Sequence, residues 1–227
     1  MMSNSRSGTA SLDVIIPPLG LGGTLTRPVD ALGLIVFAHG SGSSRFSPRN
    51  TAVARALNAQ GFATLLFDLL TPDEEADRSN VFDIALLANR LVDVVRWLGD
   101  QEPTIDTLPI GLFGASTGAA AALVAAERLS GRIAAVVSRG GRPDLAGDAL
   151  EHVRAPTLLI VGGDDAGVIE LNEEALARLP GPKALEIVPR ATHLFPEPGA
   201  LEAVIGHASR WFNRYLAPNR RRATEPR

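Results

Sequence analysis

The pentapeptide Gly114-Ala115-Ser116-Thr117-Gly118 constrains the fold of this chain more than any other segment. It follows an apolar run at 108–113 that predicts a buried strand, and it precedes an alanine-rich stretch at 117–129 that predicts a helix. Glycines flanking a serine at such a junction are typical of a sharp turn, because the neighbouring chain packs too closely for side chains. This turn would hold the serine hydroxyl above the edge of a parallel sheet, where it can act as a nucleophile.

The remaining apolar runs indicate strands that alternate with helices. Strands are predicted at 12–16, 23–27, 32–38, 62–66, 108–113, 133–137, 157–161 and 184–188. Helices are predicted at 51–60, 81–98, 117–129, 170–179 and 201–216. Such alternation predicts an α/β fold, with a mostly parallel central sheet of about seven or eight strands and helices on both faces.

The predicted elements form one domain. No repeat, low-complexity block or linker divides the chain, so we expect a single domain at 11–217, preceded by a flexible arm at 1–10 and followed by a polar tail at 218–227.

Composition excludes several classes of function. The chain has no cysteine, which rules out disulfides, thiolate metal sites and a cysteine nucleophile. Its net charge of −3 argues against a nucleic-acid platform, and the arginine run at 220–222 is too short to change this expectation. The polar start lacks the apolar core of a secretory signal, and no apolar stretch is long enough to cross a bilayer. We therefore expect a cytoplasmic protein with neither a nucleic-acid nor a membrane partner.

A serine nucleophile at neutral pH needs a base within hydrogen-bond reach. The chain contains four histidines, His39, His152, His193 and His207. His193 lies in the loop after the last predicted strand, where a base can reach Ser116, whereas His207 falls inside the final predicted helix. We therefore predict that His193 is the base.

The base needs an acid whose carboxylate accepts a hydrogen bond from the N–H of its second ring nitrogen, Nδ1. The segment VGGDD (161–165) ends a predicted strand between the serine and the histidine, and it offers Asp164 and Asp165. Either aspartate could instead cap the following helix. The pattern favours Asp165 while leaving Asp164 open. The resulting order of Ser116, Asp165 and His193 is the order expected for an α/β-hydrolase.

The negative charge that develops on an attacked carbonyl requires two backbone N–H donors. The residue after the nucleophile, Thr117, supplies one of them. The second is expected from the glycine-rich loop that follows the strand at 32–38, with Ser41 as the donor. The alternative for this loop is a plain surface turn. We interpret His39, at its start, as a structural residue that holds the loop.

Four segments together resemble the dienelactone-hydrolase-like branch of small serine hydrolases in the α/β-hydrolase superfamily. They are HGSGSSRFSPRN (39–50), GASTGAAAA (114–122), VGGDD (161–165) and ATHLF (191–195), within a resemblance that runs from about residue 12 to residue 216. The family's pattern implies that Asp165 is the acid. Dienelactone hydrolases proper use a cysteine nucleophile, which this chain lacks, so the resemblance implies ordinary ester hydrolysis by serine.

Many α/β-hydrolases carry a helical cap between the two strands predicted at 133–137 and 157–161. Only 19 residues, 138–156, connect these strands here, which is too few for a cap domain. We therefore expect an open site from which water is only partly excluded.

Four arginines follow the predicted strands at the edge where ligands of open α/β folds bind: Arg45, Arg49, Arg139 and Arg142. One or two of them, with Arg45 and Arg139 as candidates, could hold an anionic group of a substrate. The interpretation we favour is that they pair with acids such as Asp68 or Asp144.

Together these features predict a serine hydrolase that cleaves small carboxylic esters, and by the same apparatus thioesters or lactones, through an acyl-enzyme intermediate. Neither a metal nor an organic cofactor is expected. The alternative is a non-catalytic protein that uses the same scaffold to bind a ligand or a partner. The oligomeric state does not follow from the sequence.

Overall fold

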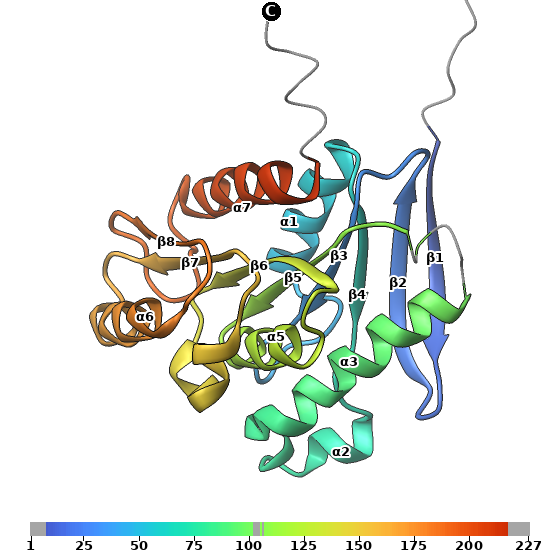
Figure 1. Cartoon of the computed structure of the whole chain (residues 1–227), viewed down its shortest axis with the longest axis horizontal. Helices are drawn as coiled ribbons and strands as arrows, with labels where there is room; N and C mark the ends of the chain where they lie inside the picture. The colour runs from blue at the N-terminus through green and yellow to red at the C-terminus, as the bar shows by residue number, and fades with distance from the viewer. Residues whose placement is uncertain (1–7, 102–104, 106, 218–227) are drawn as a thin grey trace, which may run out of the picture.

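The computed structural model describes residues 8–101, 105 and 107–217, which are built around one eight-stranded sheet (Figure 1). The strands are β1 (Thr9–Ile16), β2 (Leu21–Pro28), β3 (Leu34–Ala38), β4 (Ala63–Phe67), β5 (Ile110–Ala115), β6 (Ile133–Arg139), β7 (Thr157–Gly162) and β8 (Lys183–Val188). Their order in the sheet is β1-β2-β4-β3-β5-β6-β7-β8. The β1–β2 and β2–β4 pairs are antiparallel and all other pairs are parallel, so the predicted mostly parallel sheet is confirmed.

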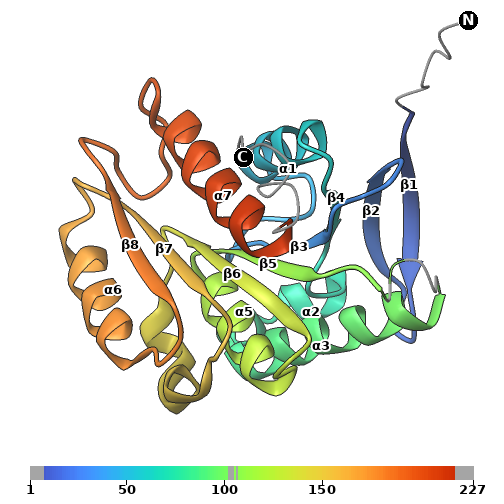
Figure 2. The ribbon, with the colours of Figure 1, turned by 45° about the horizontal axis from the view of Figure 1, so that its top comes forward.

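Helices cover both faces of this sheet. They are α1 (Pro48–Ala59), α2 (Pro72–Ala76), α3 (Ile84–Gln101), α5 (Thr117–Arg128), α6 (Ala166–Arg178) and α7 (Ala200–Leu216), with 3-10 helices η1 (Asn80–Phe82) and η2 (Pro143–His152). Figures 1 and 2 show α1 and α7 on one face, and α3, α5 and α6 on the other. Each layer has its own apolar core, because side chains alternate across the strands between them.

The centre of the sheet positions the site. β3 and β5 are buried along their whole length and pair in parallel, with Ala38 opposite Gly114. Their continuous apolar sequences suit strands that are covered on both faces. The loop after β3 and the turn after β5 therefore leave the sheet side by side, at its carboxyl edge.

The differences from the predicted elements are small and local. β1 begins at Thr9, inside the segment predicted as an arm, because Thr9 and Ala10 pair with Pro28 and Arg27 of β2. The short helices α2 and η2 were not predicted, since neither has an apolar period long enough to recognise. The predicted tail at 218–227 lies outside the described residues.

The connection between β6 and β7 holds only η2, so there is no cap domain over the carboxyl edge at this point, as predicted. Among the described residues, none of the helices combines the length and the apolar character needed to span a membrane.

Candidate active site

Ser116 lies between β5 and α5 in a backbone conformation that side chains rarely adopt. Its φ is 51° and its ψ is −122°. A Cβ added to Gly114 or to Gly118 would come under 3.0 Å of backbone atoms, from Ala119 and Ala38 respectively. The two glycines thus permit a turn that no larger residue allows, and the strain at the serine is of the kind that concentrates at functional positions.

Asp165 and His193 meet at the carboxyl ends of two neighbouring strands. His193 Nδ1 lies 2.7 Å from Asp165 Oδ2. Asp165 is also the residue before α6, but its side chain makes no capping hydrogen bond, whereas Asp164 is exposed. Of the two aspartates left open by the residue pattern, the structure places Asp165 beside the histidine.

His193 and Ser116 lie on either side of the turn after β6. The Ser116 N–H donates to the carbonyl of Arg139 at 3.3 Å. A Cβ on the next residue, Gly140, would lie 2.9 Å from the His193 carbonyl oxygen and 3.6 Å from its ring atom Cε1. Gly140 therefore lets the histidine loop approach the serine turn closely.

The loop after β3 passes directly beside the serine. A Cβ on Gly40 would lie 3.0 Å from Ser116 Cβ. The next backbone N–H, that of Ser41, donates to Thr117 Oγ1 at 3.1 Å. Thr117 is the first residue of α5, so its own N–H has no acceptor within the helix. The two predicted oxyanion donors thus belong to residues in direct contact.

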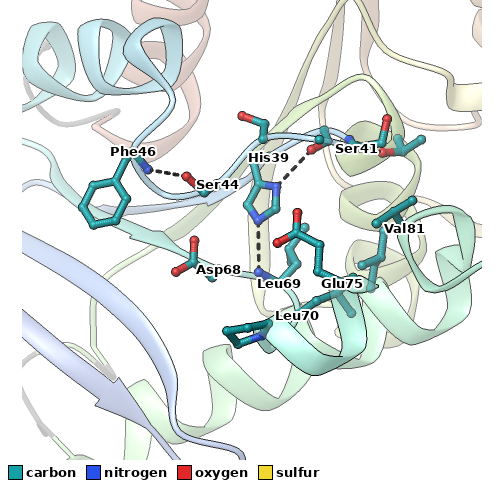
Figure 3. Close-up of a pocket in the computed structure, with 15 residues that line it drawn as sticks. His39, Ser41, Ser44, Phe46, Asp68, Leu69, Leu70, Glu75 and Val81 are labelled. Carbon is teal, nitrogen blue, oxygen red and sulfur yellow. Dashed lines mark hydrogen bonds between the residues drawn. The ribbon is translucent and has the colours of Figure 1, made fainter. Parts of the chain in front are cut away.

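His39 is fixed by two backbone hydrogen bonds. The Leu69 N–H donates to its Nε2 at 3.1 Å, so Nδ1 carries the proton and donates to the Gly40 carbonyl at 3.0 Å (Figure 3). Burial lowers the pKa of His39, which favours the neutral ring that this pattern requires. His39 therefore ties the Ser41 loop to the end of β4, in agreement with the structural role predicted for it.

A pocket of about 140 Å³ opens beside the Ser41 loop and reaches Thr117 (Figure 3). Its apolar wall includes Leu69, Leu70, Val81 and Leu87. Figure 3 shows Glu75 of α2 pointing its carboxylate toward the His39 side of the pocket.

The part of this pocket that α2 contributes, Pro72 and Glu75, was not predicted, because no element was expected at 72–76. The capping box that Thr71 and Glu74 form around Pro72 and Asp73 was the available signal.

Two of the four arginines are paired with acids. The Arg45 guanidinium forms an ion pair with Asp68, whose other oxygen accepts the Arg45 N–H at 2.8 Å. Arg142 binds Asp144 through two hydrogen bonds of 2.9 and 2.8 Å. These pairs match the interpretation favoured from the sequence. Arg45 is thereby occupied as a loop brace.

The other two arginines, Arg49 and Arg139, have no acidic partner among the described residues. Arg139 is only 6% exposed, and its Nε and Nη1 atoms are buried without a hydrogen-bond partner. The Nε atom of Arg49 is also buried and unpartnered. Burial, and then the neighbouring Arg49, lower the pKa of Arg139 to about 10, so it remains charged at neutral pH.

No group of three or more histidine, aspartate or glutamate side chains that could hold a metal ion occurs in the part of the chain that the structure describes.

Solved structures share this architecture. A dienelactone hydrolase from Anabaena variabilis is 54% identical, with a TM-score of 0.87 and coverage of 92% of this chain and 98% of that chain. The chain belongs to the dienelactone hydrolase family. Est1E from Butyrivibrio proteoclasticus is 17% identical with a TM-score of 0.76, covering 91% of this chain and 99% of its own, and it supports the α/β-hydrolase fold alone.

Two curated relatives are longer than this chain. Proteins from two strains of Mycobacterium tuberculosis, each named "putative phosphoribosyl transferase", are 60% identical over 205 residues. The match covers 90% of this chain and 46% of theirs, so the chain spans about half the length of these curated relatives. No family model matches the chain.

Proposed function

We propose that this member of the dienelactone hydrolase family cleaves small carboxylic esters, with Ser116 as nucleophile, His193 as base and Asp165 as the acid that orients the base. The observation that carries the proposal is the 2.7 Å contact between His193 Nδ1 and Asp165 Oδ2, beside a serine with a strained backbone. The dienelactone hydrolase from Anabaena variabilis supports this chemistry by its name.

In the first half of the reaction, Ser116 Oγ attacks the ester carbonyl carbon and transfers its proton to His193 Nε2. Asp165 accepts a hydrogen bond from the His193 Nδ1–H group and stabilises the imidazolium that forms. The tetrahedral intermediate then collapses, the bond to the alcohol oxygen breaks, and the alcohol leaves with the proton from His193. In the second half a water repeats the attack on the acyl-serine, giving the carboxylic acid and free Ser116.

The oxyanion of each intermediate would accept hydrogen bonds from the N–H groups of Ser41 and Thr117. In the free protein the Ser41 N–H donates to Thr117 Oγ1, which holds the loop against α5. Substrate binding requires this N–H to turn toward, or be shared with, the oxyanion.

The pocket beside Thr117 sets an upper limit on the group that binds there. Its volume of about 140 Å³ is well below the roughly 300–1,000 Å³ of typical drug-sized ligand sites, and close to that of cavities that hold one benzene ring. With no cap over the β6–β7 connection, longer groups must extend into solvent. We therefore assign short acyl groups, or one aromatic ring, to this pocket.

Hydrolysis of p-nitrophenyl esters of increasing acyl length tests the proposal. We expect kcat/KM to be highest for the acetate and butyrate esters and to fall for the octanoate. Ser116→Ala should abolish turnover of all of them. Thioester and lactone substrates of similar size use the same apparatus and belong in the same screen.

The alternative is a ligand-binding protein on the same scaffold. This alternative predicts saturable binding of these esters without turnover in the wild-type chain.

The hydrolytic proposal concerns the half of the Mycobacterium tuberculosis relatives that this chain matches. Ser116, Asp165 and His193 all lie within the matched part of this chain.

A further inference from the structure

Asn172, in α6, is a fully buried polar residue that binds the turn after β6, at 139–142. We infer that Asn172 is a positioning residue for ester cleavage. It holds the 139–142 turn, and through this turn Ser116, in a fixed position relative to the helix that follows Asp165. The inference rests on the proposed function, because it concerns the placement of the same serine.

The 139–142 turn binds both backbone groups of the nucleophile. The Arg139 carbonyl accepts the Ser116 N–H at 3.3 Å, and the Arg142 N–H donates to the Ser116 carbonyl at 3.2 Å. Ser116 has a positive φ, so its backbone is strained and keeps this conformation only where its surroundings hold it. A displacement of the 139–142 turn would therefore displace the serine.

The same turn contacts the other parts of the site. A Cβ on Gly141 would lie 2.7 Å from Ala119 Cβ in α5, and a Cβ on Gly140 would lie 2.9 Å from the His193 carbonyl oxygen. The Gly140 N–H donates to the Ile160 carbonyl of β7 at 2.8 Å. The turn is thus the place where the nucleophile helix, the histidine loop and the strand before the acid meet.

Asn172 connects this turn to the helix that begins after Asp165. Its Nδ2 donates to the Gly141 carbonyl at 3.0 Å and to the Val168 carbonyl, one turn earlier in α6, at 2.8 Å. The Val168 N–H in turn donates to the Asp165 carbonyl at 2.9 Å. The backbone of the acid and the turn beneath the serine are therefore held by the same end of α6.

Stability alone does not explain an asparagine at this position. Its Oδ1 atom is buried, and none of the described residues offers it a hydrogen bond. A buried oxygen without a partner costs free energy, and a leucine of similar size would avoid that cost. A leucine, however, could not donate to the Gly141 carbonyl. The amide therefore suits a residue that fixes the turn better than one that only fills the core.

Asn58 provides a matched control. It lies in α1, and its Nδ2 donates to the Phe62 carbonyl at 3.0 Å. Phe62 directly precedes β4, so this bond lies at the amino edge of the parallel strands, opposite the site. Asn172→Leu and Asn58→Leu therefore remove the same kind of hydrogen bond, beside the site in one case and at the other edge of the sheet in the other.

The rate and the extent of labelling by a fluorophosphonate separate a positioning role from a structural one. We expect Asn172→Leu to lower the second-order rate constant for labelling of Ser116 roughly tenfold or more, because misplaced reacting groups slow the chemical step. The final extent should stay at the wild-type level, since every folded chain still carries the serine. A residue that only keeps the chain folded would lower the extent and leave the rate constant unchanged. Asn58→Leu should match the wild type in the rate constant.

The pH dependence of p-nitrophenyl acetate hydrolysis is the second readout. In Asn172→Leu, kcat/KM should fall by a similar factor at every pH and keep its wild-type midpoint, because the contact between His193 and Asp165 does not involve Asn172. A shifted midpoint would place the effect in the histidine–aspartate pair and overturn the inference.

Asn172→Ser replaces Asn172→Leu if the leucine variant does not fold. The serine hydroxyl can donate to the Val168 carbonyl within the helix, but its side chain is one bond shorter than the asparagine donor arm that binds Gly141. We expect the same slower labelling from this variant.

A labelling rate constant in the folded Asn172 variant equal to that of the wild type would overturn the inference, as would an equal loss in Asn58→Leu. Slower labelling of Asn172→Leu, in a protein that hydrolyses no ester, would contradict the proposed function and leave the positioning role standing. Ester hydrolysis at the same kcat/KM in the wild type and both variants would do the reverse.

Discussion

Nδ1 of His193 lies 2.7 Å from Oδ2 of Asp165, although 28 residues separate them in the chain. The two residues follow β8 and β7, which are parallel neighbours in the sheet, so their loops emerge at the same edge. The side chain of His193 is 37% exposed and that of Asp165 is 18% exposed. The acid is therefore the more sheltered partner, and the base remains open to substrate and water.

Replacing the acid should separate the two neighbouring aspartates. We expect Asp165→Asn to lower kcat/KM for a short p-nitrophenyl ester by about 10³ to 10⁴, because an amide cannot hold the histidine in the required tautomer. Asp164→Asn should keep activity close to wild type, since Asp164 is exposed. Equal losses in the two variants would argue against Asp165 as the acid. Far-ultraviolet circular dichroism of both variants checks that each is folded.

The glycine after Thr117 should be intolerant of any side chain. A Cβ on Gly118 would come under 3.0 Å of the carbonyl oxygens of Ala38 and His39, which are backbone atoms that cannot move aside. We expect Gly118→Ala to lower the free energy of unfolding by about 3 kcal/mol or more.

Gly206, in the middle of α7, is the matched control for this substitution. The nearest atom to its added Cβ is the flexible Arg210 Nη1 at 3.4 Å. Gly206→Ala should therefore stabilise the protein by about 0.5–1 kcal/mol, because alanine loses less backbone freedom in a helix. Urea denaturation measures both changes. Similar destabilisation by both substitutions would contradict the close packing described for the serine turn.

His39 should make stability depend on pH. Its pKa is lowered by burial, from an ordinary value of 6.5, so between the folded and unfolded pKa values only the unfolded chain binds the proton. The neutral ring thus contributes its full stability above pH 6.5, and this contribution is lost as the pH falls through the lowered pKa.

The variant His39→Gln isolates this effect. Without a titrating group at position 39, the free energy of unfolding should fall less steeply below pH 6.5 than it does in the wild type. Urea denaturation at several pH values measures the two slopes. Identical slopes would mean that His39 takes up a proton equally well in the folded and unfolded chains.

Local patterns were sufficient to predict most of the fold. The apolar runs predicted the central strands because these are buried on both faces, as β3 and β5 are. The spacing of Leu87, Leu91 and Leu98 gave α3, where all three are buried. The short helices α2 and η2 were not predicted because neither has a long apolar period, and α2 is fixed by its capping box instead.

The sequence predicted the parts of the candidate site whose geometry depends on neighbouring residues in the chain. It did not predict which ion pairs form between side chains from distant segments. The strained turn at Ser116 follows from its glycines, and the placement of His193 follows from its loop. The sequence offered Asp68 and Asp144 as acidic partners, but which of the four arginines they neutralise is visible only in the folded structure, where Arg45 meets Asp68 and Arg142 meets Asp144. The sequence therefore could not predict that Arg139 lacks an acidic partner among the described residues.

Labelling with a fluorophosphonate probe, followed by peptide mass spectrometry, tests whether Ser116 is a nucleophile activated by His193. We expect one adduct on the Ser116 peptide of the wild type and none in Ser116→Ala or His193→Ala. A correctly folded wild-type chain that forms no adduct, or one that carries its adduct on another serine, would contradict this expectation.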